Sequence, residues 1–201
     1  MPTLKSLKIP HQNSSVDCDV REDMADQPAV LVLDIDGVCH PLTDKGVAAL
    51  AKLSDLTARC DRELDLDDSA TGEVVDGEFV EPCMHALARA VRVTRAEIVL
   101  SSTWRETALQ RRAVDGQLRA HGIPAHSGCT PMLPLLEGGR AAEILAWADA
   151  TQSSKQRWVA IDDNPAVNKL PEGHFVWTDY RTGFTEADAD TVIALLNAGE
   201  R

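Results

Sequence analysis

Three short apolar runs in this chain each end in polar side chains, and these side chains are the ones best suited to chemistry. If the runs are parallel strands, their carboxyl ends meet at one edge of a sheet, where open α/β proteins bind ligands. Polar groups would be costly inside a sheet, whereas at the strand ends they can be hydrated or bind a ligand. The residues at the three ends are Asp34 and Asp36, Ser101 and Ser102, and Asp162 and Asp163.

These residue types together predict metal-assisted phosphoryl chemistry. Carboxylates that converge on one crevice repel each other, so a cation is needed to hold them. Oxygen ligands without a histidine or thiol cluster favour Mg²⁺ over Zn²⁺. A carboxylate beside such an ion can attack phosphorus, and a second can protonate the leaving oxygen and then activate water. A hydroxyl and a fixed cation nearby can stabilise the transferring phosphoryl group.

The elements that must position these residues alternate between strands and helices. This alternation predicts a three-layer α/β/α sandwich with a mainly parallel, five-stranded sheet. Apolar runs predict strands over 29–34, 96–102, 123–127, 158–162 and 175–178. Helical spacing of apolar residues predicts helices over 46–60, 81–93, 103–120 and 140–150, and a final helix that Thr185 caps.

Two helix boundaries carry specific signals. Thr103-Trp-Arg-Glu106 matches a capping box and predicts that a helix begins there. His121-Gly122 predicts the end of that helix. Residues 1–27 are polar and unpatterned and are interpreted as a flexible leader, followed by one domain over 28–201. The acidic segment 61–76 is expected to be an exposed loop or a reduced insert.

Composition limits the function classes. The net charge of −12 disfavours a broad nucleic-acid-binding surface or an anionic membrane as partner. No apolar run is long enough for a membrane span, and the first residues lack a signal-peptide core. The five cysteines form no C-x-x-C pair, so reduced thiols are expected. A cytoplasmic protein is therefore expected.

The order of these motifs resembles the haloacid dehalogenase (HAD) superfamily of phosphohydrolases. The D-x-D-G motif at Asp34, the strand that ends in serine, the basic residue at a helix start and the Asp-Asp strand end occur in the family's order. Segments such as Leu100-Ser-Ser-Thr-Trp-Arg105 are similar to a small-cap branch found in multifunctional RNA-repair proteins. The resemblance implies a HAD-like Rossmannoid fold, Mg²⁺ and a phosphorylated substrate. It also implies that the strand bearing Asp34 is central and that region 41–95 holds only a small cap.

The resemblance also implies a role for each motif residue. Asp34 would be the nucleophile and a metal ligand, and Asp36 the general acid/base, with its backbone carbonyl on the metal. Asp163 would ligate the metal, and Asp162 would ligate or support it. Gly37 would allow the sharp turn after the strand.

Two roles have alternatives. The phosphate-binding hydroxyl belongs to Ser101 or Ser102, whose side chains alternate in direction; Ser102 is preferred because it lies nearer the strand tip. The catalytic cation, usually lysine in this family, is assigned to Arg140, with Lys155 as the alternative. Arginine at a helix start is unfavourable for the helix dipole, which favours a functional reason for it.

Further residues near the motifs could contact the substrate. Thr103 follows the serines, Arg105 could reach the pocket mouth or form a surface salt bridge, and His40 lies just past the first motif. Trp104 is expected to pack in the core. Three functions remain open: a Mg²⁺-dependent phosphomonoesterase, a phosphatase that processes RNA or DNA ends, and a non-enzymatic phosphate-binding module.

Overall fold

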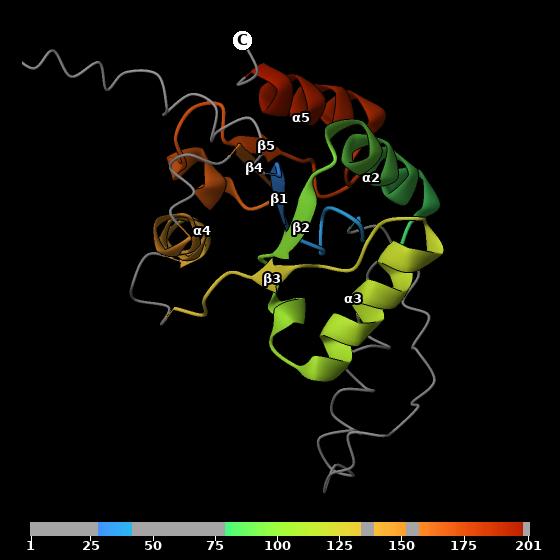
Figure 1. The fold of residues 1–201 in the computed structure, drawn as a ribbon, viewed down its shortest axis with the longest axis horizontal. Helices are drawn as coiled ribbons and strands as arrows, with labels where there is room; N and C mark the ends of the chain where they lie inside the picture. The colour runs from blue at the N-terminus through green and yellow to red at the C-terminus, as the bar shows by residue number, and fades with distance from the viewer. Residues whose placement is uncertain (1–27, 42–78, 134–138, 152–156, 199–201) are drawn as a thin grey trace, which may run out of the picture.

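The structure is a computed structural model that describes residues 28–41, 79–133, 139–151 and 157–198. Within these ranges five strands form one parallel sheet in the order β3-β2-β1-β4-β5. The strands are β1 (Val30–Leu33), β2 (Glu97–Leu100), β3 (Gly128–Cys129), β4 (Trp158–Asp162) and β5 (Phe175–Trp177). The predicted sheet is confirmed, and β1, which leads into Asp34, is its central strand (Figure 1).

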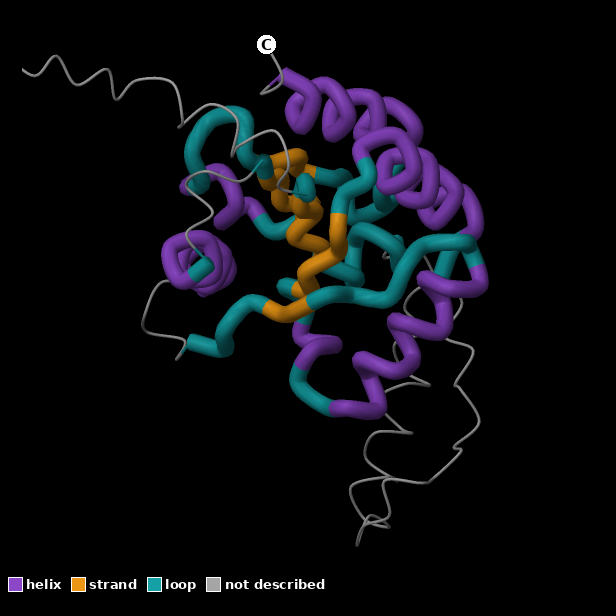
Figure 2. The backbone as a smooth tube through the Cα atoms, viewed as in Figure 1, coloured by secondary structure: helices purple, strands orange, loops and turns teal. Residues whose placement is uncertain are grey.

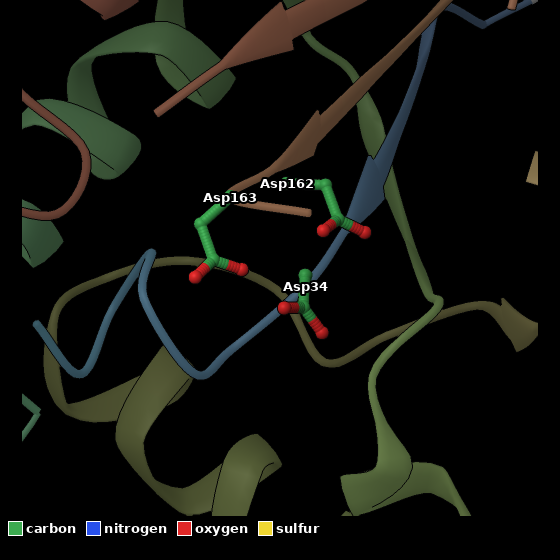
Figure 3. A group of neighbouring side chains, drawn as sticks. All are labelled: Asp34, Asp162 and Asp163. Atoms are coloured by element: carbon green, nitrogen blue, oxygen red, sulfur yellow. The ribbon is translucent and has the colours of Figure 1, made fainter. Parts of the chain in front are cut away.

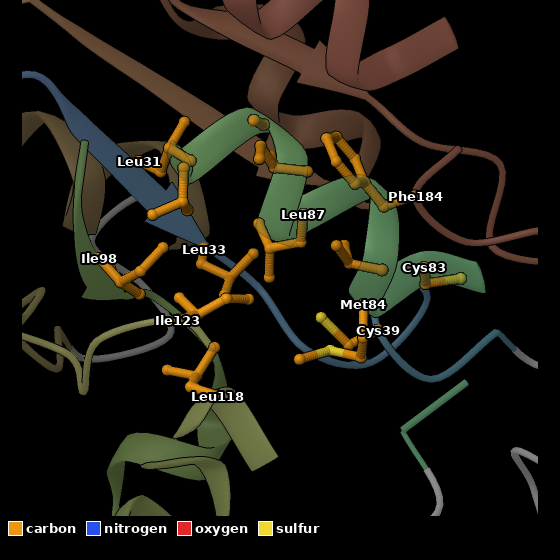
Figure 4. Close-up of a cluster of buried hydrophobic side chains, with 14 of the residues drawn as sticks. Leu31, Leu33, Cys39, Cys83, Met84, Leu87, Ile98, Leu118, Ile123 and Phe184 are labelled. Atoms are coloured by element: carbon orange, nitrogen blue, oxygen red, sulfur yellow. The ribbon is translucent and has the colours of Figure 1, made fainter. Parts of the chain in front are cut away.

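The central strand is apolar on both faces because helices cover both sides of the sheet. Leu31 and Leu33 point into one cluster, which Leu87 and Phe184 also join (Figure 4). Val30 and Val32 point into a second cluster on the opposite face. A strand that is buried on both faces reads as a continuous apolar run, as this one does.

Helices form the two outer layers of the sandwich (Figure 2). The first cluster is covered by α2 (Glu81–Thr94), α3 (Ala108–Ala120) and α5 (Glu186–Ala198). The second is covered by α4 (Gly139–Ala150) and the 3₁₀ helix η4 (Pro165–Lys169). The three-layer α/β/α architecture follows from these two separate cores.

The helix expected to begin at Thr103 starts later than predicted. A 3₁₀ helix, η1 (Thr103–Arg105), comes first, and the side chain of Ser102 caps it by accepting a hydrogen bond from the Trp104 backbone N–H. The α-helix α3 begins at Ala108, where Thr107 and Gln110 form the capping box. Two capping sequences lie here, one beginning at Thr103 and one at Thr107, and the prediction chose the first, which is wrong. The turn that begins at Thr103 is a 3₁₀ helix that buries Trp104 and Arg105.

The third strand also differs from its prediction. It was expected over 123–127 and lies at β3, where Gly128 pairs with Val99. Other expected elements are confirmed within a residue or two: α2, α4, β4 and the final helix, which Thr185 and Asp188 cap reciprocally. The predicted leader 1–27, helix 46–60 and loop 61–76 lie outside the described residues. Among the described helices, none is long and apolar enough to cross a bilayer.

Candidate active site

Two neighbouring strands deliver three carboxylates to one point at the carboxyl edge of the sheet. Asp34 follows β1, Asp162 ends β4, and Asp163 comes next in the chain. Each of the three offers a carboxylate oxygen, and these oxygens all lie within 4.8 Å of one another (Figure 3). Asp34 and Asp162 are buried and Asp163 is half-buried. The strand register therefore assembles the acidic cluster that the motif order predicted.

The cluster is electrostatically unfavourable without a cation. Burial, together with the charge of Asp162, raises the pKa of Asp34 to about 8. Burial also raises the pKa of Asp162 to about 6, despite the nearby guanidinium of Arg140, and it raises the pKa of Asp163. Charged carboxylates are disfavoured here both by lost hydration and by mutual repulsion. The site therefore favours protons or a bound cation.

Arg140 is the positive group of the described residues that faces the cluster. It is the second residue of α4, and its Nη2 lies 3.3 Å from Asp34 Oδ1 while its Nε lies 3.3 Å from Asp162 Oδ2. These contacts explain why an arginine occupies a helix start, where the helix dipole disfavours it. The alternative cation, Lys155, lies outside the described residues.

Several buried polar atoms at the site have no hydrogen-bond partner in the described structure, although three of them take part in the 3.3 Å ion pairs of Arg140. Buried polar groups in proteins are nearly always hydrogen-bonded, so such a concentration indicates that the site takes a ligand. The donors among them suit an anion and the carboxylate oxygens suit Mg²⁺, which prefers hard oxygen ligands. The atoms are Asp34 Oδ1, Asp162 Oδ2, Ser101 Oγ, and Arg140 Nε and Nη1. The residues present therefore fit a divalent cation with an anionic group beside it.

Gly37 permits the close approach of the β1 loop to Asp163. Its φ is +74°, and a Cβ added there would overlap the Asp163 carboxylate. The Gly37 carbonyl also accepts a hydrogen bond from the buried hydroxyl of Thr178, which follows β5. The glycine thus fixes the distance between the two aspartate-bearing loops.

Replacing Gly37 with alanine is expected to destabilise the protein and to weaken Mg²⁺ binding. The left-handed backbone alone costs about 1–2 kcal/mol for an L-residue. In addition, the new Cβ would push aside the carboxylate of Asp163, which is a candidate metal ligand. Gly122→Ala is the matched control, because Gly122 has a φ of +73° and no atom within 4 Å of its added Cβ. Urea unfolding and the Mg²⁺-induced rise in Tm should both be measured. An Mg²⁺ effect equal in the two variants would contradict this role for Gly37.

Asp36 is not a member of the three-carboxylate cluster, and its carboxylate binds other side chains. Its carboxylate oxygens accept the indole N–H of Trp104 at 3.0 and 3.2 Å, and His40 Nδ1 lies 3.6 Å from Asp36 Oδ1. The side chain is one-third exposed. A carboxylate beside the cluster, with access to solvent, can exchange a proton without serving as a side-chain ligand.

The two candidate serines have different environments. The Ser101 hydroxyl is buried and has no partner, whereas the Ser102 hydroxyl caps η1. Leu33 pairs with Leu100, so Ser101 is the next residue across from Asp34. Of the two serines, Ser101 has the hydroxyl without a protein partner, whereas the sequence had favoured Ser102 as the phosphate-binding residue.

Arg105 and His40, which the sequence suggested could contact a substrate, are both buried in the structure. Arg105 is buried, and all five of its N–H donors meet protein acceptors, including Glu143 of α4 at 2.7 Å. His40 is fully buried against Phe79 and Trp104. Thr103, by contrast, is exposed at the start of η1.

Three further residues shape the site and were not predicted from the sequence. Trp104 was expected only to pack, yet its N–H binds Asp36; a buried tryptophan normally needs such a partner, which was the available signal. Glu143 pairs with Arg105 across α4 and η1, and Thr178 binds the Gly37 carbonyl. No sequence pattern indicates these last two partners, because they are distant along the chain.

One of three comparisons with known proteins, the one with protein families, agrees with the geometry of the site. The searches of the curated proteins and of the solved structures found no match to the chain. A family model described as the HAD domain in Swiss Army Knife RNA repair proteins matches residues 30–189, which include every described residue of the acidic cluster. Family membership indicates hydrolase chemistry on a phosphorylated substrate. The chain therefore belongs to the HAD superfamily, within the family of HAD domains of Swiss Army Knife RNA repair proteins.

Proposed function

We propose that the protein is a Mg²⁺-dependent phosphomonoester hydrolase with Asp34 as its nucleophile. The observation that carries this proposal is the buried cluster of Asp34, Asp162 and Asp163, whose oxygens converge within 4.8 Å. One carboxylate oxygen of Asp34 and one of Asp162 lack hydrogen-bond partners in the described structure. Buried carboxylates with this spacing are suited to share a cation, and the cation is suited to share a phosphate oxygen.

Each residue has a distinct task in the proposed reaction. Asp34, Asp162 and Asp163 would hold Mg²⁺, which when bound neutralises carboxylate charge and polarises the phosphoryl group. Asp34 attacks phosphorus as the ester bond breaks, and Asp36 gives its proton to the leaving oxygen. Asp36 then removes a proton from water, which cleaves the aspartyl-phosphate. The Ser101 hydroxyl and the Arg140 guanidinium bind the phosphoryl oxygens.

Hydrolysis of p-nitrophenyl phosphate tests the proposal directly. The wild-type protein is expected to release p-nitrophenol with added Mg²⁺ and to stop when a chelator removes the metal. Restoring Mg²⁺ in excess over the chelator should restore the rate, which separates metal dependence from irreversible damage. Turnover that is indifferent to chelator would overturn the metal assignment, and no turnover with any phosphate ester would favour the phosphate-binding module.

The stabilisation by Mg²⁺ is expected to grow as pH rises. The pKa of Asp34 is raised from 3.8 to about 8, so between these values the folded state binds more protons than the unfolded state. Without metal, stability should fall across that window as pH increases. Metal ligation requires ionised carboxylates, so the Mg²⁺-induced rise in Tm should be larger at about pH 8 than at about pH 6. Thermal unfolding with Mg²⁺ or with chelator measures both trends, and a pH-independent Mg²⁺ effect would contradict them.

A second candidate function is removal of phosphate from RNA or DNA ends. The family's occurrence in RNA repair proteins favours it, while the net charge of −12 disfavours a large electrostatic contact with nucleic acid. Oligonucleotides with 3′- or 5′-phosphate should be compared with small phosphate esters. A kcat/KM at least tenfold higher for one oligonucleotide end would support end processing, and equal values would support a small-molecule phosphatase.

A further inference from the structure

The side chain of Asp36 is held by one buried donor. The Trp104 indole Nε1 lies 3.0 Å from Asp36 Oδ1 and 3.2 Å from Oδ2, so a single N–H is shared by both oxygens. Trp104 itself is only 2% exposed. A donor placed between both oxygens fixes the plane of the carboxylate as well as its position.

The tryptophan is in turn held rigidly. The ring of His40 meets it edge-on with centroids 5.0 Å apart, and Phe79 does so at 5.8 Å. Its backbone lies in η1, which Ser102 caps at the end of β2. The indole therefore links the β1 loop, which carries Asp36, to the end of the neighbouring strand. Such support of a reacting group by a packed neighbour improves the precision of its orientation.

We propose that Trp104 is a positioning residue that orients Asp36 for protonating a basic leaving oxygen, which adapts the site to phosphate esters of aliphatic alcohols. This inference rests on the proposed function, because it assigns Asp36 the proton-transfer role. When the ester bond breaks, its electron pair moves to the leaving oxygen, which takes the Asp36 proton while Asp34 forms its bond to phosphorus. An aliphatic alkoxide needs that proton, whereas p-nitrophenolate leaves without it.

Trp104→Phe removes the indole N–H and retains an aromatic ring. For an alkyl phosphate such as glycerol phosphate, kcat/KM, which reports formation of the aspartyl-phosphate and not its hydrolysis, is expected to fall by about 10–100-fold, because positioned proton transfer contributes about 10²–10⁴-fold. For p-nitrophenyl phosphate, kcat/KM should change by less than about threefold, because its leaving group needs no proton. Trp147→Phe is the matched control, since Trp147 is also buried, 8% exposed, but packs on the opposite face of the sheet.

A second variant separates positioning from damage to the fold. In kcat/KM, Asp36→Asn should show the same selective loss on the alkyl ester, and adding Trp104→Phe to it should cause little further loss, because the tryptophan acts through Asp36. An equal loss of kcat/KM on both esters, or additive losses of kcat/KM in the double variant, would overturn the inference. A wild-type protein that hydrolyses neither ester would overturn the proposed function as well.

NMR can test the hydrogen bond between the Trp104 indole N–H and Asp36 without an activity measurement. The indole N–H resonance of Trp104, identified by its absence in Trp104→Phe, should move upfield and exchange faster in Asp36→Ala, because its acceptor is removed. The indole resonances of the other three tryptophans should stay in place. An unchanged Trp104 resonance would overturn the inference independently of any activity.

Discussion

Asp34→Asn is expected to reduce phosphatase kcat by at least about 10⁴-fold, the scale on which loss of a catalytic nucleophile acts. The amide retains the size of the side chain but cannot form the bond to phosphorus. The same change should abolish most of the Mg²⁺-induced rise in Tm, because one of the three converging carboxylates is removed. The measurements are steady-state hydrolysis of p-nitrophenyl phosphate and thermal unfolding with Mg²⁺ or chelator.

The stability of the metal-free variant provides an additional test. Burial and the charge of Asp162 raise the pKa of Asp34 to about 8, so ionising this carboxyl opposes folding. A neutral amide does not carry that cost, and metal-free Asp34→Asn should be at least as stable as the wild type at about pH 8.

Two controls make the Asp34 result specific. Asp36→Asn retains the three-carboxylate cluster and should keep the Mg²⁺-induced rise in Tm while lowering hydrolysis of alkyl esters. Asp190→Asn alters a surface carboxylate that is 73% exposed and pairs with Arg89, so it should leave activity and metal binding unchanged. Substantial turnover by Asp34→Asn would show that another group attacks phosphorus.

The sequence predicted the parts of the fold that depend on local patterns. Continuous apolar runs identified β1 and β4, because both strands are buried on two faces. Their polar ends located the cluster, since parallel strands present their carboxyl ends at one edge. The family resemblance correctly implied the central place of β1, which no local pattern indicates.

What the sequence could not predict depends on contacts between distant segments. The start of α3 was misplaced because Thr103 and Thr107 both begin capping-box sequences, and the burial of Trp104 decides between them. Which serine keeps a hydroxyl without a protein partner depends on the cap of η1, which uses the Ser102 hydroxyl. The pairing of Arg105 with Glu143 joins residues 38 positions apart, and no periodicity encodes it.

Among the substitutions proposed for this protein, Arg105→Ala is expected to lower the free energy of unfolding most, by about 3–5 kcal/mol. The guanidinium donates to the backbone carbonyls of Ser101 and Ser102 at 2.5 and 2.6 Å, and to Glu143 at 2.7 Å. Its side chain is 3% exposed and that of Glu143 is 13% exposed. Removing the arginine would leave a nearly buried carboxylate unpaired and several carbonyls without a donor, and each such group costs free energy.

The same substitution at an exposed arginine isolates the effect of burial. Arg119 is 63% exposed and lies 3.7 Å from Asp115, so Arg119→Ala should cost less than about 1 kcal/mol. Arg105→Ala combined with Glu143→Leu should recover part of the lost stability, because no unpaired charge then remains buried.

Arg105 also connects the serine-bearing end of β2 to α4, which carries Arg140, so any folded Arg105→Ala protein should show a raised KM for phosphate esters. Urea unfolding and steady-state kinetics measure these effects, and a loss no greater than that of Arg119→Ala would show that the Arg105–Glu143 pair does not hold the site together.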